Sequence, residues 1–291
     1  MYSDQDKAEI LVDALPYIQE FYGTTVVIKY GGNAMINDAL KENVMRDVAL
    51  MKFVGIRPIL VHGGGPEITG FLKKVGKEST FVSGLRVTDE ETVEIAEMVL
   101  DGKLNSEIVG LLNLRGVRLS GKDAGLIKAQ KKLATVYEND TAHQIDIGYV
   151  GEVTEINTSI IADLLNQGYV PVIAPIGMGE HGESYNINAD YVAAEIAGAL
   201  HAEKLLLLTD VEGVYKKFAD KSSFLSQLRM DEAREYIRSG IIEGGMIPKV
   251  EACLRALEAG AHKAHIIDGR LAHSIILEIF TSRGIGTMVL R

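Results

Sequence analysis

Short runs of apolar residues recur along the chain, and segments with helical spacing separate them. The runs are TTVVIKY, RPILVH, YVPVIAP, KLLLLTD, AHIID and TMVL. Because successive strand residues point to opposite faces, strands built from such runs must be covered on both faces, as in parallel sheets with crossover helices. The pattern predicts an α/β fold, a three-layer αβα sandwich around a mainly parallel, open sheet.

Two stretches depart from this alternation. Residues 126–157 alternate apolar and polar side chains around Asn139 and Asp140, which predicts a hairpin at an edge of the sheet. Residues 5–22 have helical spacing and stop at Gly23, so we expect a helix that packs on the body or on another subunit. Its apolar positions are Ile10, Leu11, Leu15, Ile18 and Phe21.

Charge and cysteine content narrow the class of partner. The net charge is −10, and this argues against a nucleic acid or an anionic membrane, which require a basic face. Cys253 is the only cysteine, which excludes an intrachain disulfide and favours a reducing compartment. With no apolar run of membrane-spanning length and no signal-like start, we expect a cytoplasmic protein.

Two helix starts follow glycines. In LVHGGGPEI, three glycines precede Pro66, which suits the first turn of a helix, so unshielded backbone N–H groups meet the positive end of a helix dipole. In EGGMIPKV, Lys249 lies in the first helical turn, where a cation opposes the dipole unless an anion docks against it. Lys29 ends an apolar strand just before Gly31 and Gly32. These features predict anion binding.

Two further helix starts carry polar side chains. Asn188 is a plausible N-cap, with Asp190 in the first turn, where a carboxylate suits the dipole. Thr88 and Glu91 have the spacing of a capping box, two residues after Arg86. Taken one at a time, these residues also have simpler interpretations. Lys29 could reach solvent from its strand end, and Asp190 could be an ordinary first-turn carboxylate. Arg86 could form a surface ion pair, and the three glycines could form a tight turn.

Two motif matches are misleading. GVRLSGKD has the spacing of a P-loop, but Asp123 stands where a hydroxyl should bind magnesium, and no apolar strand is expected before it. Ile68 stands where a dinucleotide fingerprint after Gly63 would need its third glycine, which weakens an NAD site. His62 has no second ligand at metal spacing, so we expect it to hydrogen-bond in its turn and expect no protein-built metal site.

Taken together, the motifs resemble the amino acid kinase family over essentially the whole chain, and within it the branch that phosphorylates N-acetyl-L-glutamate. They are VVIKYGGNAM, ILVHGGGPEI, GLRVTD, GKD, VIAPIGMG, YNINAD, LLLLTDVEGV and GGMIPKV. The resemblance implies an N-terminal lobe for acetylglutamate, 24–178, and a C-terminal lobe for ATP, 179–291, with 1–23 as a helical extension for oligomerisation. It also implies ATP with Mg²⁺ held mainly through phosphates.

The resemblance assigns roles residue by residue. Lys29 and Lys249 stabilise the transferring phosphoryl group, and Asp190 orients both. Residues implied for the acid are Gly64, Gly65, Arg86 and Asn186. Residues implied for the nucleotide are Gly31, Gly32, Thr209, Asp210 and Gly245.

The N-terminal helix and HSIILEIFTSRGIG resemble the arginine-sensitive, hexameric branch. That likeness implies an inhibitor site for L-arginine built from Lys204, His265, Glu278 and Gly284. The short VRL before SGKD departs from the family pattern, and an abbreviated strand is expected there.

Two other functions stay open at this point. A sister kinase could act on an aminoadipate derivative, aspartate or glutamate, because GLRVTD and YNINAD rather than the fold set the acid. A catalytically silent arginine-sensing subunit would keep the fold as a binding module. Presence of Lys29, Lys249 and Asp190 disfavours the second.

Overall fold

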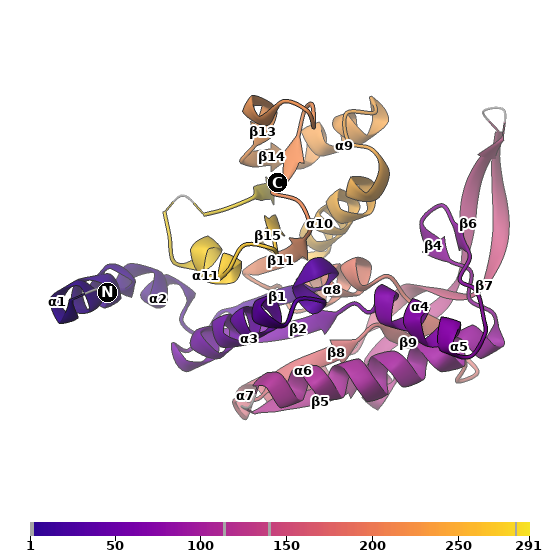
Figure 1. The fold of residues 1–291 in the computed structure, drawn as a ribbon, viewed down its shortest axis with the longest axis horizontal. Helices are drawn as coiled ribbons and strands as arrows, with labels where there is room; N and C mark the ends of the chain where they lie inside the picture. Colours follow the sequence, from indigo (N-terminus) through magenta and orange to yellow (C-terminus); the bar gives the residue numbers. More distant parts are fainter. Residues whose placement is uncertain (1–2, 113–114, 139–140, 283) are drawn as a thin grey trace.

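The computed structural model describes residues 3–112, 115–138, 141–282 and 284–291. A large sheet runs through the middle of the molecule, with helices on both sides (Figure 1). Its strand order is β14-β16-β15-β11-β1-β2-β8-β5. In that order the strands are Gln227–Arg229, Thr287–Leu290, Lys263–Asp268, Lys204–Thr209, Thr25–Tyr30, Arg57–His62, Val170–Ala174 and Gly116–Ser120.

The pairing is parallel from β5 to β15. β16 runs antiparallel to β15, and β14 runs parallel to β16. Every apolar run expected to form a strand does so, and the α/β sandwich is confirmed. The parallel order brings the carboxyl ends of β1, β2 and β11 to one edge, where ligands of such sheets bind.

The core has two layers because successive strand residues face opposite sides. Val27 of β1 packs in one cluster, and Val26 and Ile28 pack in the other. The first cluster is covered by α7 (Ser159–Asn166), α8 (Ala189–Ala199), α9 (Met230–Arg238) and α10 (Ile247–Ala259). The second is covered by α3 (Asp38–Phe53), α4 (Gly65–Lys74), α5 (Glu90–Glu97), α6 (Asn105–Leu112) and α11 (Ser274–Ile279).

A smaller β-structure stands beside the large sheet. It joins the long hairpin β6 (Ile127–Glu138) and β7 (Thr141–Ile156) with β9 (Ile176–Met178) and β10 (Ser184–Asn186) in a closed barrel. The hairpin expected over 126–157 is confirmed, but it pairs within this barrel and not at an edge of the large sheet; it projects from the body in Figure 1. The turn expected at 139–140 lies outside the described residues.

Short elements complete the described chain. Two-residue strands form β3 (Phe81–Val82) with β4 (Leu85–Arg86), and β12 (Val214–Tyr215) with β13 (Phe224–Leu225). A π-helix, η2 (Met98–Leu104), lies between α5 and α6. The 3₁₀ turns are η1 (Gly32–Met35), η3 (Asp123–Gly125), η4 (Lys221–Ser223) and η5 (Gly244–Met246). In the described residues no helix is long and apolar enough to span a membrane.

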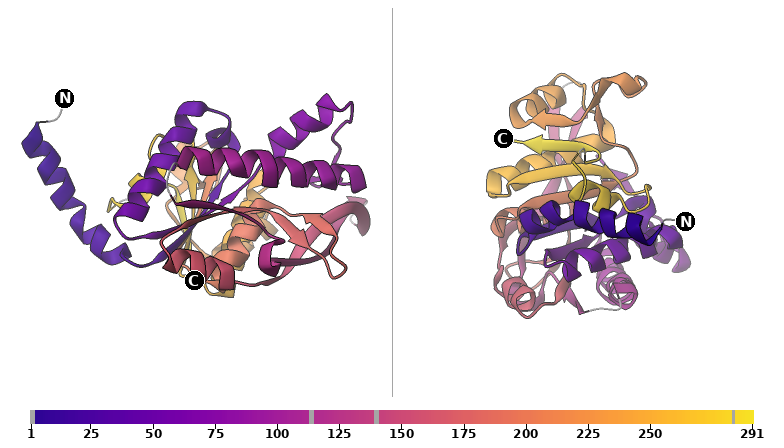
Figure 2. Two further views of the ribbon diagram at one scale, coloured as in Figure 1. Left: turned by 90° about the horizontal axis from the view of Figure 1, so that it is seen from below. Right: turned by 90° about the vertical axis from the view of Figure 1, so that its left-hand side faces the viewer.

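The N-terminal segment forms two helices where one was expected. α1 (Asp4–Asp13) and α2 (Leu15–Phe21) are separated at Ala14, because Pro16 has no N–H to donate and its ring crowds the preceding turn. α1 buries none of its residues, and Figure 2 shows it extending away from the body. Phe21 is buried in the second core cluster and anchors α2.

Two smaller expectations were wrong. Asp89, not Thr88, caps α5, because its carboxylate accepts the Thr92 N–H at 2.9 Å. The Thr88 hydroxyl instead donates to the Arg86 carbonyl. β5 is not abbreviated: its residues pair with β8 from Gly116 to Ser120.

Thus a strand does precede the GKD segment, although a 3₁₀ turn rather than a P-loop helix follows it.

Candidate active site

Two pockets meet at the carboxyl end of β1, and Lys29 and Gly32 line both. The first has a volume of about 270 Å³ and lies against the glycine turn after β2. The second has a volume of about 850 Å³ and is lined by residues at the carboxyl end of β11 and at the start of α10. The smaller suits an amino-acid-sized ligand and the larger a nucleotide.

Lys29 and Lys249 converge on one buried carboxylate. Lys29 Nζ lies 2.9 Å from Asp190 Oδ1, and Lys249 Nζ lies 3.2 Å from Asp190 Oδ2. Burial alone would raise the pKa of Asp190, but the two lysine charges outweigh it and hold the pKa below its ordinary value. The three residues come from β1, α10 and α8, so the sheet and two helices fix this junction.

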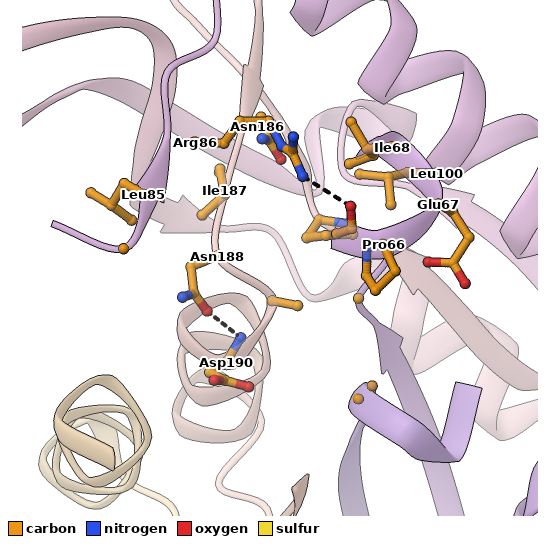
Figure 3. A pocket seen from close by; sticks show the side chains of 18 of the residues that line it. Pro66, Glu67, Ile68, Leu85, Arg86, Leu100, Asn186, Ile187, Asn188 and Asp190 are labelled. Atoms are coloured by element: carbon orange, nitrogen blue, oxygen red, sulfur yellow. Dashed lines mark hydrogen bonds between the residues drawn. The ribbon is translucent and has the colours of Figure 1, made fainter. Parts of the chain in front are cut away.

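The local backbone explains how these side chains reach the junction. Asn188 caps α8, because its Oδ1 accepts the Asp190 N–H at 2.8 Å (Figure 3). Gly31 leaves room for the Lys29 ammonium, since a Cβ there would lie 2.6 Å from Nζ. α10 begins at Ile247 with Pro248 in its first turn, and Lys249 follows in the same turn, where the anionic Asp190 offsets the unfavourable dipole.

The glycine turn after β2 forms one wall of the smaller pocket. A Cβ on Gly64 would lie 2.5 Å from side-chain atoms of Leu100 and Leu104, whereas a Cβ on Gly65 would meet nothing within 4 Å. A side chain at position 64 would therefore clash with the two leucines, whereas the backbone at Gly65 is accessible to a ligand. As expected, α4 begins here with Pro66 in its first turn.

Arg86 supplies a buried positive charge to the same pocket. It is 7% exposed, and its guanidinium donates to Ser79 Oγ at 2.6 Å and to Thr69 Oγ1 at 2.9 Å. It also donates to the Gly65 carbonyl at 2.9 Å (Figure 3). None of these partners carries a charge, and burial lowers the pKa of Arg86. A buried guanidinium held by neutral groups favours an anionic ligand.

The expected acid-binding residues come together in the smaller pocket. Gly64, Gly65, Arg86 and Asn186 all line it. Asn186 to Asp190 lie in the range 179–291, so this pocket draws on both expected lobes. Residues that sequence reasoning missed here are Leu85, Leu100, Val150 and Ile187. Their apolar side chains carry no motif, and only the fold places them at the pocket.

The larger pocket gathers most of the residues expected for a nucleotide. Gly32, Thr209, Asp210 and Gly245 line it together with Lys249, whereas Gly31 lines only the smaller pocket. Gly32 has φ of 66°, and a Cβ there would lie 2.6 Å from Asp210 Oδ1. Glycine is therefore required at this close approach.

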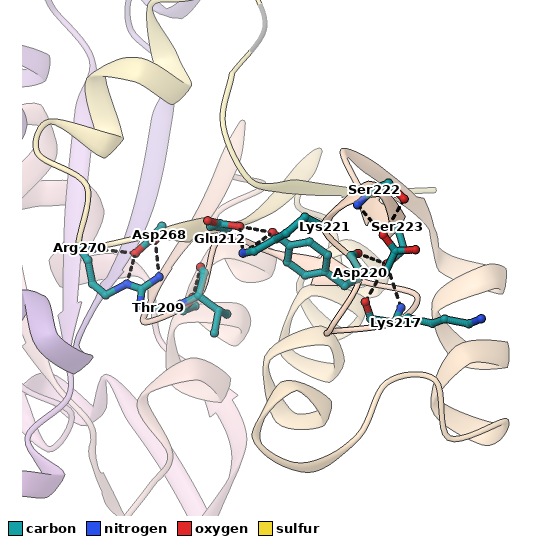
Figure 4. Close-up of polar contacts among 11 residues, drawn as sticks. Thr209, Glu212, Lys217, Asp220, Lys221, Ser222, Ser223, Asp268 and Arg270 are labelled. Carbon is teal, nitrogen blue, oxygen red and sulfur yellow. Dashed lines mark hydrogen bonds and ion pairs between the residues drawn. The ribbon is translucent and has the colours of Figure 1, made fainter.

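A loop after β12 borders the larger pocket and was missed from the sequence. The lining residues are Tyr215, which ends β12, and Lys216, Lys217 and Phe218 of the loop. Lys221 pairs with Glu212 at 2.6 Å, and Arg270 with Asp268 at 2.8 Å, beside it (Figure 4). The sequence offered one indication of this loop: Lys216 and Lys217 directly follow LLLLTDVEGVY, and cations near the end of a strand can bind phosphates.

A third pocket, of about 240 Å³, contains all the residues expected for arginine: Lys204, His265, Glu278 and Gly284. Glu278 Oε1 lies 3.0 Å from Lys204 Nζ and 2.9 Å from His265 Nδ1. Burial would raise the pKa of Glu278, but the His265 hydrogen bond and the Lys204 charge bring it to about 2. Burial lowers the pKa of His265.

Two other expectations concern metals. His62 is fully buried, and its Nδ1 lies 2.8 Å from the Gly63 carbonyl, as expected for a turn histidine. Among the described residues, no group of three or more histidine, cysteine, aspartate or glutamate side chains could hold a metal ion.

Comparison with known proteins identifies the class. The profile of the amino acid kinase family matches residues 24–268. The chain therefore belongs to the amino acid kinase family.

Two relatives within this family are similar to the chain over nearly its whole length. Acetylglutamate kinase of Pelotomaculum thermopropionicum is 56% identical over 293 residues, covering 99% of each chain. Acetylglutamate kinase of Heliobacterium modesticaldum is 57% identical over 290 residues, covering 98% of each.

Solved structures share the fold. N-acetylglutamate synthase from Neisseria gonorrhoeae, complexed with coenzyme A and N-acetyl-glutamate, is 26% identical with a TM-score of 0.82. The match covers 98% of this chain but 63% of the synthase chain. Carbamate kinase from Giardia lamblia bound to AMP-PNP is 16% identical with a TM-score of 0.64, covering 92% of this chain and 98% of that one. The second likeness concerns the fold alone.

Proposed function

We propose that this chain is an acetylglutamate kinase of arginine biosynthesis. It transfers the γ-phosphoryl group of ATP to the side-chain carboxylate of N-acetyl-L-glutamate and yields ADP and N-acetyl-L-glutamyl 5-phosphate. The observation that carries the proposal is the convergence of Lys29 and Lys249 on Asp190 between two pockets of unequal size. Near-full-length relatives of that name support the choice of acid.

The chemistry is a phosphoryl transfer that needs charge neutralisation rather than a base. The acceptor carboxylate is already ionised at neutral pH. Its approach to the triphosphate is opposed by repulsion of about 4 kcal/mol for two unit charges 4 Å apart at an effective dielectric near 20. Lys29 and Lys249 oppose that repulsion, and Asp190 holds their ammonium groups in place before substrates arrive.

Each pocket then takes one substrate. In the smaller pocket, Arg86 and Asn186 hold the acid, and the backbone at Gly64 and Gly65 faces the transferring group. In the larger pocket, Gly32, Thr209, Asp210 and Gly245 surround the nucleotide. Mg²⁺ accompanies ATP and neutralises phosphate charge when bound. We thus assign 24–178 mainly to the acid and 179–291 mainly to ATP, with Asn186 and Asp190 crossing that division.

Regulation and assembly form a further part of the proposal. The pocket around Glu278 takes L-arginine, because the buried Glu278 carboxylate is an anionic partner for a guanidinium, which would share it with Lys204 and His265. The exposed helix α1 mediates association of subunits, in a hexamer of this family's arginine-sensitive type. Segment 1–23 is assigned to that role.

An ADP-release assay across several acids tests the activity. We expect turnover with N-acetyl-L-glutamate, and turnover at least about 10² lower with aspartate, glutamate and an aminoadipate derivative; added arginine lowers the rate. A different preferred acid would point to the sister kinase. Arginine binding by calorimetry without turnover of any acid would instead support the silent sensor.

A further inference from the structure

The GKD segment after β5 has no part in the proposed transfer. A Cβ on Gly121 would lie 2.0 Å from the Ile176 carbonyl oxygen, so the segment packs directly on β9. The Asp123 carboxylate accepts the Ser120 N–H at 2.8 Å and closes the turn. Both neighbours of Lys122 are therefore fixed by the fold, and its side chain extends from a rigid base.

Lys122 joins two other elements through a closed ring of polar contacts. Its Nζ lies 3.0 Å from Glu97 Oε1 and donates to Ser184 Oγ at 2.9 Å. The Ser184 hydroxyl donates to Glu97 Oε2 at 2.5 Å. The Lys122 and Glu97 side chains are 30% and 32% exposed, so the ring is screened less than a fully exposed surface pair.

Both partners of Lys122 belong to walls of the smaller pocket. Ser184 begins β10, which continues to Asn186, one of the residues that line the pocket. Glu97 ends α5 and directly precedes the π-helix η2, whose Leu100 also lines the pocket. Leu100 packs against Gly64, since a Cβ on that glycine would lie 2.5 Å from its Cδ2. Figure 3 shows Leu100 beside the turn after β2.

We propose that Lys122 is a positioning residue for the acid pocket. It does not line that pocket; it holds β10 and η2 at a fixed separation through Ser184 and Glu97, and so sets the distance between Asn186 and the Gly64 turn. π-helices are uncommon and often occur at functional sites, and this one begins at the residue after Glu97. The inference rests on the proposed function.

The test compares Lys122→Met, which keeps the length and removes the charge, with Lys122→Arg and with the control Lys128→Met. Lys128 pairs with Glu155 on the hairpin, and both are more than half exposed. For Lys122→Met we expect KM for N-acetyl-L-glutamate to rise about tenfold, equivalent to about 1.4 kcal/mol. We expect kcat and KM for ATP to stay within about twofold, Lys122→Arg to restore most of the loss, and the control to match wild type.

Calorimetric binding of N-acetyl-L-glutamate provides a readout without turnover. Absence of both binding and turnover in wild type overturns the proposed function. Active wild type with unchanged acid KM in Lys122→Met, or with an equal rise for ATP, overturns the positioning role alone. Should Lys122→Met fail to fold, Glu97→Gln and Ser184→Ala replace it in the same test. Each removes one member of the ring, from α5 and from β10 respectively.

Discussion

Lys249 stands in a first helical turn, where a positive charge is disfavoured by the dipole. Its ion pair with Asp190 at 3.2 Å explains how the fold tolerates it. The same pair keeps the ammonium beside Lys29, since both lysines share one carboxylate. The unfavourable position of the charge at the helix start is thus offset by the ion pair with Asp190.

Replacing Lys249 tests that role. For Lys249→Ala we expect kcat to fall by about 10² to 10³, the size seen when one preorganised charge donor is lost. Steady-state assays at saturating acid and ATP measure it, and Lys103→Ala on the surface of η2 is the control. A kcat close to wild type would contradict the assignment.

His62 shows how burial of one side chain makes stability depend on pH. It ends β2 next to the glycine turn and is fully buried. Burial lowers its pKa from 6.5 to about 4, although the Gly63 carbonyl contact acts in the opposite direction. Between those pH values the unfolded chain binds a proton that the folded chain does not, so the free energy of unfolding falls as pH falls.

This sign gives a measurable difference for His62→Gln. Between pH 7 and pH 5 the wild type should lose roughly 2 kcal/mol of unfolding free energy more than the variant, from the linkage of the two pKa values. Urea unfolding at one protein concentration measures it, with His181→Gln, on an exposed loop, as the control. Parallel pH dependence in wild type and His62→Gln would refute the argument.

Among the α-helices of the described chain, α1 alone buries none of its residues. Leu11 and Val12 are 70% and 67% exposed. Exposed apolar side chains on a projecting helix mark an interaction surface. In the proposed assembly, a second subunit binds this surface of α1.

Deleting residues 1–20 tests α1 as an element. We expect the oligomer mass from light scattering to fall and arginine inhibition to weaken, while kcat without arginine stays near wild type, because no residue before Lys29 lines either substrate pocket in the described chain. Lys7→Gln, which removes only an exposed ion pair, is the matched control. An unchanged mass would exclude this role for α1.

For the whole molecule, the parallel sheet explains why the two substrate pockets adjoin. β1 lies between β2 and β11, so the turns after these three strands open at one edge. The turn after β2 borders the smaller pocket, the turn after β11 borders the larger, and Lys29 from the central strand lines both. In a chain of net charge −10, the cations of this edge supply the local positive field that anionic substrates need.

Sequence reasoning worked best where a local rule applies. Apolar runs identified the main strands, because burial on both faces demands it. Glycine before Pro66 and Asn188 before Asp190 identified helix starts, because their backbone chemistry is local. It failed at Pro16, where a continuous apolar pattern concealed a break, and at the strand before Ser120, whose edge position requires few apolar residues.

The sequence by itself determined the strands, the helix starts and the charged residues that end or begin them, since these follow from neighbours a few positions apart. Only the tertiary structure decided that Lys29 and Lys249 both contact Asp190. It also decided that Leu100 packs against Gly64 and that Lys122 connects α5 to β10. Those contacts join residues far apart in the chain, and their distances depend on how the sheet, barrel and helices pack together.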